Sequence, residues 1–154
     1  MSVPPDSVDL AKRLGREVVM VGVDASVGGL HALWHARDLA EAHAAQLVVV
    51  FVHHLPTAAV VGVAAGFGGA AVATSMVEAD VVKERVASML ADFAGSWEWH
   101  VMEGDPARQL STAADEFDAD LIVVGPGRHG ARRRGVARRL LQYTTRTVLV
   151  CGGR

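Results

Sequence analysis

Five short apolar runs, separated by segments with helical periodicity, constrain the fold of this chain more than any other feature. Four of the runs are rich in β-branched residues, as strands buried on both faces are. The run at 97–102 instead alternates with a period near two, which is typical of a half-exposed edge strand. The predicted strands are 17–23, 46–53, 97–102, 120–124 and 147–151. The predicted helices are 27–44, 74–93, a helix that starts at Pro106, and 136–145. Ser26 and Asp105 are the expected N-caps of the first and third helices. The second helix is expected to have one apolar side, formed by Val77, Val81, Val82, Val86, Met89 and Phe93.

This alternation predicts one α/β domain, because crossover helices join parallel strands. We expect an open five-stranded parallel sheet with strand order 3-2-1-4-5 and helices on both faces, a Rossmann-like arrangement. The domain covers residues 16–154, and residues 1–15 are predicted to be a flexible N-terminal tail. The strand order reverses between strands 1 and 4, so a ligand is expected at the carboxyl ends of these two strands.

Two stretches that are distant in the sequence are predicted to converge at that point. Asp24 closes the first strand, and the stretch GPGRHGARRRG at 125–135 follows the fourth. Glycine amides after a strand can approach an anion closely, and arginines pair with phosphate. The alternatives are a turn-forming or capping role for Asp24, and an ordinary turn or solvated basic loop for 125–135. The pattern G-x-G-x-x-G at 125–130 does not indicate dinucleotide binding, because that pattern belongs at the first strand.

The distribution of charge favours a small anionic ligand. All 17 acidic residues lie within residues 1–120, whereas residues 121–154 hold 8 arginines and no acid. Nucleic acid is disfavoured as a partner, because proteins that bind it usually present a broader basic face. A compact basic end attracts a small anion such as the phosphate of a nucleotide.

Three other sequence features exclude alternatives. The uncharged segment 55–77 is long enough to span a bilayer, but glycine and alanine dominate it, so a loop and a helix start are expected. The single cysteine, Cys151, excludes an internal disulfide, fits a cytoplasmic location and is expected to be inert. His31 and His35 have the spacing of metal ligands on a helix, but without a third ligand we expect a solvated face.

Several blocks of the sequence, in their order and spacing, resemble the universal stress protein family over residues 16–151. These blocks are VGVDAS at 21–26, EGDPA at 103–107, ADLIVVG at 119–125, VARRLL at 136–141 and TTRTVLV at 144–150. The resemblance implies a cytoplasmic homodimer that pairs through its C-terminal strand, 147–151. It also implies binding of ATP or another adenine nucleotide, with or without Mg.

The resemblance also assigns candidate site residues. Asp24, Ala25 and Val52 would contact the adenosine, although Ala25 and Val52 fit plain core packing equally well. The phosphates would lie against the glycine stretch and the start of the following helix, where His129 could tune binding near neutral pH. The candidate nucleotide-binding residues are Asp24, Ala25, Val52, Gly125, Gly127, Arg128, His129, Gly130, Gly135 and Val136.

The glycine stretch departs from the pattern of the ATP-binding members. That pattern is Gly, two residues, Gly, nine residues, then Gly followed by Ser or Thr. Here Arg128 stands where the second glycine is expected, and Gly127 lies one place early. Seven residues separate Gly127 from Gly135, and Val136 supplies no hydroxyl. The loop is therefore shortened, and arginines stand near the positions of the missing groups.

Two functions follow from these observations. The first is an adenine-nucleotide-binding regulator or sensor in the stress response. The alternative is a dimeric stress protein that does not bind ATP and acts through protein contacts, because its loop is shortened and lacks the Ser or Thr. The sequence holds no G-x-S-x-G or HExxH motif and no Cys–His pair within a motif, so no enzyme activity beyond very slow ATP hydrolysis is expected.

Overall fold

The computed structural model describes residues 15–53, 64–66, 69–126 and 135–152. Within these residues strands and helices alternate along the chain, as the sequence predicts. The strands are β1 (Val18–Val23), β2 (Gln46–His53), β3 (Trp97–Glu103), β4 (Leu121–Val124) and β5 (Thr147–Val150). The main helices are α2 (Val27–Ala42), α4 (Gly69–Met89), α5 (Pro106–Glu116) and α6 (Gly135–Tyr143).

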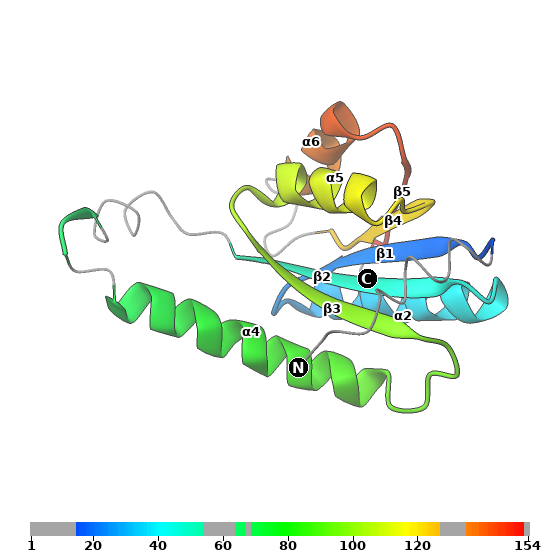
Figure 1. Cartoon of the computed structure of the whole chain (residues 1–154), viewed down its shortest axis with the longest axis horizontal. Helices are drawn as coiled ribbons and strands as arrows, with labels where there is room; N and C mark the ends of the chain where they lie inside the picture. Colours follow the sequence, from blue (N-terminus) through cyan, green and yellow to red (C-terminus); the bar gives the residue numbers. More distant parts are fainter. Residues whose placement is uncertain (1–14, 54–63, 67–68, 127–134, 153–154) are drawn as a thin grey trace.

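The strands form one parallel sheet in the order β3-β2-β1-β4-β5, which confirms the predicted topology. β1 lies at the centre, with Val21 beside Val49 of β2 and Val123 of β4. β3 is an edge strand whose residues are half-buried or exposed, in agreement with its predicted place. Figure 1 shows α5 and α6 on one side of the sheet and α2 and α4 on the other.

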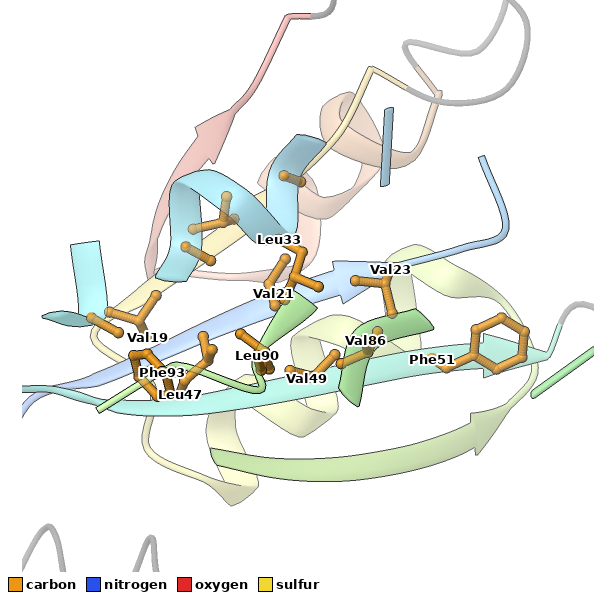
Figure 2. Close-up of a cluster of buried hydrophobic side chains, with 14 of the residues drawn as sticks. Val19, Val21, Val23, Leu33, Leu47, Val49, Phe51, Val86, Leu90 and Phe93 are labelled. Atoms are coloured by element: carbon orange, nitrogen blue, oxygen red, sulfur yellow. The ribbon is translucent and has the colours of Figure 1, made fainter. Parts of the chain in front are cut away.

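Alternate residues of the central strands point into two separate cores. Val19 and Val21 of β1 pack toward α2 and α4, whereas Val18 and Met20 pack toward α5 and α6. Figure 2 shows the first core, in which β1 and β2 side chains meet Leu33 of α2 and residues from α4 and its C-terminal end. Because both faces of β1 and β2 are covered, these strands need continuous apolar runs rather than an alternating pattern.

The structure corrects two expectations for α4. The helix begins at Gly69 and not at residue 74, so it includes more of the glycine- and alanine-rich segment 55–77 than was expected. Val77 and Val81, predicted to face the core, are 62% and 45% exposed. The buried positions are instead Ala79, Val82 and Val86. Apolar residues therefore occupy both a buried and an exposed side of α4. The first turns of this helix extend beyond the ends of the strands (Figure 1).

Smaller differences concern the ends of elements and the tail. α6 ends at Tyr143 and β5 at Val150, slightly earlier than predicted. The predicted capping of α5 is confirmed, since the Asp105 side chain accepts a hydrogen bond from the Arg108 amide. Of the predicted tail 1–15, residues 1–14 lie outside the described residues. Among the residues that are described, no helix is long and apolar enough to cross a membrane.

Helix α6 has one fully buried anchor, Leu140, with no exposed surface, next to Leu141, which is 61% exposed. Truncating Leu140 leaves a cavity between α6 and the sheet. We therefore expect Leu140→Ala to lower the free energy of unfolding by about 2–5 kcal/mol. Leu141→Ala is the matched control and should change it by less than about 0.5 kcal/mol. Urea unfolding followed by circular dichroism measures both, and equal effects would contradict this role for Leu140.

Candidate functional site

The carboxyl ends of β1 and β4 lie side by side, as predicted for the point where the strand order reverses. Gly22 of β1 is in register with Val124 of β4. Asp24 follows β1 and Gly125 follows β4, so the two candidate stretches begin next to each other. Open α/β sheets bind ligands at such a point, because the chains diverge there and leave strand ends and helix starts facing solvent.

The turn after β1 is held by the side chains of Asp24 and Ser26. The Ser26 amide donates a hydrogen bond to Asp24 Oδ1 over 2.9 Å, and the Ser26 hydroxyl donates to the same oxygen. Ser26 Oγ in turn accepts from the Gly29 amide at 3.1 Å, which makes Ser26 the N-cap of α2, as predicted. Asp24 is half-buried, and its carboxylate is thereby fixed at the start of the helix.

Glycines bring the backbones of the two stretches into direct contact. A Cβ atom on Gly125 would lie 2.4 Å from the carbonyl oxygen of Gly28. A Cβ atom on Gly28 would lie 2.9 Å from Cδ of Pro126, and one on Gly29 would lie 2.5 Å from Asp24 Oδ1. Real side chains do not tolerate such distances, so glycine is required at all three positions for this packing. The contact of Gly28 with Pro126 was not predicted, because it depends on packing between two segments that are far apart in the chain.

The other described candidate residues differ in burial and in position. Ala25 is exposed beside Asp24. Val52, near the end of β2, and Val136, in the first turn of α6, are half-buried and pack against the core beneath α5 and α6. Gly135 opens α6, and a Cβ atom there would meet open space. The positions of Val52 and Val136 fit core packing, and their contact with a nucleotide stays a prediction.

Four candidate residues lie outside the described residues: Gly127, Arg128, His129 and Gly130. The described part of the site therefore consists of the Asp24 turn, the Gly125–Pro126 pair and the start of α6. On α2, the exposed His31 and His35 have ring centroids 6.3 Å apart. Within the described ranges no three His, Cys, Asp or Glu side chains are grouped as metal ligands would be.

The sheet order and the site at the β1–β4 switch point define an open, doubly wound α/β protein. Residues 15–151 match the sequence model of the universal stress protein family. Because this match covers most of the chain, the protein belongs to that family, and the resemblance inferred from the sequence blocks is confirmed. No curated protein sequence matches the chain.

Solved structures show the same fold. A universal stress protein family member from Burkholderia pseudomallei is 26% identical, with 96% of this chain and 98% of that chain covered and a TM-score of 0.70. A universal stress protein in complex with cAMP is 25% identical over 89% of this chain and 97% of its own, with a TM-score of 0.61. A universal stress protein from Archaeoglobus fulgidus in complex with dAMP is 22% identical over 88% and 96%, with a TM-score of 0.62.

The close approach at Gly125 gives a test of how the site is built. Gly125→Ala forces its new methyl group against the Gly28 carbonyl, so the turn after β1 and the chain after β4 must separate. We expect a loss of about 1–3 kcal/mol in the free energy of unfolding, as in other overpacked positions. Gly135→Ala, where the added methyl meets open space, should be neutral or slightly stabilising. A similar loss in both variants, measured by urea unfolding, would contradict the packing argument.

Proposed function

We propose that this protein is a cytoplasmic regulator or sensor that binds an adenine nucleotide at the β1–β4 switch point. The observation that carries the proposal is the direct contact between the Asp24 turn and Gly125–Pro126, which places a fixed carboxylate beside strand ends and a helix start. Two structures of similar fold are complexes with cAMP and dAMP, so adenine nucleotides are known ligands of such relatives.

In this proposal the adenosine and the phosphates of the nucleotide contact different groups of the protein. The Asp24 carboxylate accepts hydrogen bonds from hydroxyl or amine groups of the adenosine, between Ala25 and Val52. The phosphates lie toward Gly125 and the N-terminus of α6 at Gly135, where helix amides favour negative charge. Val136 offers no hydroxyl to a phosphate or to Mg, so affinity for the triphosphate depends on amides and on the arginines of the preceding loop.

A binding role fits this site better than catalysis. A fast hydrolase needs a nucleophile or a general base held close to the reacting phosphate. The one thiol of the chain, Cys151, is buried, and this burial raises its pKa, which keeps it protonated and unreactive. We therefore propose at most very slow ATP hydrolysis. The protein would then act as a sensor through the difference between its nucleotide-bound and nucleotide-free forms.

The alternative is a dimeric stress protein that does not bind ATP and acts through protein contacts. The short spacing from Gly127 to Gly135 and the valine at 136 favour it. Under this alternative the turn at Asp24 is a helix-capping structure, which the hydrogen bonds of Ser26 already explain. The two functions differ in one measurable property, the affinity for adenine nucleotides.

Nucleotide titration separates the two functions. We expect the native protein to release an adenine nucleotide on denaturation, or to bind ATP, ADP or AMP in calorimetric titration. Asp24→Ala should weaken binding by about tenfold or more, because it removes a charged hydrogen-bonding partner. Asp38→Ala, which removes an exposed carboxylate from α2, is the matched control and should bind as the parent does.

The same titration can contradict the proposal. If the protein releases no nucleotide on denaturation and binds none at millimolar concentration, the proposal is excluded. A variant with two residues restored to the loop and with Val136→Ser then tests the alternative. If that variant gains ATP binding which the parent lacks, the shortened loop is the reason for the loss.

We also propose that the protein is a homodimer that pairs through β5. Within the described residues β5 has a strand partner only on its β4 side, and Leu149 and Val150 are 38% and 46% exposed. An uncovered apolar edge strand invites pairing with another chain. Leu149→Asp should therefore convert a dimer into a monomer, as measured by sedimentation. Leu141→Asp, at a more exposed position on α6, should leave the dimer intact. A monomeric parent protein would contradict this pairing.

A further inference from the structure

A cluster of charged and aromatic side chains joins α5 to α6 and takes no part in the proposed nucleotide site. Arg108 Nε donates to the hydroxyl oxygen of Tyr143 over 3.4 Å, and the Arg108 guanidinium lies 5.3 Å from the centre of the Tyr143 ring. Arg139 lies near enough to Tyr143 for the two groups to influence each other's pKa, and its Nη1 lies 2.7 Å from Asp105 Oδ1. Guanidinium groups from two different helices thus lie near one phenol.

The backbone around this cluster holds its members in place. Ser111, which is buried, donates its hydroxyl to the carbonyl oxygen of Tyr143 over 3.0 Å and fixes the end of α6 against α5. Asp105 Oδ2 accepts from the Arg108 amide at 3.1 Å and fixes the start of α5. The two arginines therefore extend from a framework that is fixed by hydrogen bonds within α5 and between α5 and α6.

Positive charge exceeds negative charge in this cluster. Arg139 is paired with Asp105, whereas Arg108 makes no ion pair with any described carboxylate, and both of its side-chain contacts are with neutral Tyr143. The hydrogen bonds from Arg108 and Arg139 hold the pKa of Tyr143 below its ordinary value. The tyrosinate is favoured because a negative charge at this oxygen would be stabilised by the neighbouring guanidinium groups.

We propose that Arg108, Arg139 and the Tyr143 hydroxyl form a binding site for the phosphate group of a small phosphate monoester. Guanidinium groups bind phosphate oxygens in pairs, and two of them suit a doubly charged anion. The phenol donates a third hydrogen bond to the same group. The site is open to a ligand, since Tyr143 is 41% exposed and the Arg139 side chain 47%.

Tyr143 is the only tyrosine of the chain, so it reports directly on this site. A bound phosphate places negative charge beside the phenol and raises the pKa of Tyr143 toward its ordinary value. The ultraviolet absorbance of the tyrosinate measures that pKa in the full-length protein, at pH values where arginine stays charged. We expect inorganic phosphate and phenyl phosphate to raise it in a saturable way, whereas chloride at equal ionic strength does not.

Three variants test which side chains hold the anion. Arg108→Gln should raise the pKa of Tyr143 without ligand and weaken phosphate binding about tenfold or more. Arg139→Gln should act in the same direction. Arg138→Gln, which removes an exposed arginine next to Arg139, is the matched control and should leave both quantities unchanged. The broadening of the phosphorus NMR signal of inorganic phosphate measures binding without using the phenol as a reporter. In Tyr143→Phe this broadening should be weaker than in the parent, because one hydrogen bond to the phosphate is lost.

Several results would overturn the proposal. One is an equal response of Tyr143 to phosphate and to chloride, which would indicate general ionic screening. Another is unchanged phosphate affinity in Arg108→Gln, and a third is an equal loss in Arg138→Gln. Adenosine, which has no phosphate, should not shift the pKa of Tyr143. A shift with adenosine would mean that the response comes from the nucleotide site, and it would likewise overturn the proposal.

Discussion

The parallel pairing of β1 with both β2 and β4 is the constraint on which the rest of this structure depends. Because neighbouring strands are parallel, helices must join successive strands, and these helices cover both faces of β1. The order in which strands are added to the sheet reverses between β1 and β4. The ends of these two strands are therefore left facing a common space, and the residues proposed to bind a nucleotide lie on the segments that follow them, except Val52, which lies near the end of β2.

The candidate site is built with few functional side chains. Three glycines allow the turn after β1 to touch the chain after β4, and a single carboxylate is fixed by Ser26 at the start of α2. In the proposed nucleotide site the remaining contacts would come from backbone amides and helix starts. A change of loop length would alter the positions of these amides while the sheet stays the same.

The strand order, the opposed helix layers and the meeting of Asp24 with Gly125 could be predicted, because they follow from apolar periodicity and from the topology of parallel sheets. The exposed side of α4 could not be predicted, since Val77 and Val81 have helical spacing with buried residues and only the helix's position decides which side faces the core. The contact between Gly28 and Pro126 and the cluster at Tyr143 depend on tertiary packing between segments far apart in the chain. No local pattern encodes such contacts.

The single buried anchor of α6 has a consequence for the dynamics of the domain. β1 and β2 lie between two cores, whereas α6 packs against only one of them, through the buried Leu140 and the half-buried Val136 and Ala137. Local opening of α6 therefore exposes far less apolar surface than global unfolding and requires a smaller free energy. Amide hydrogens of α6 should exchange with solvent through this opening. Since the proposed phosphate contacts begin at the same helix, ligand binding and protection of α6 from exchange would be thermodynamically linked.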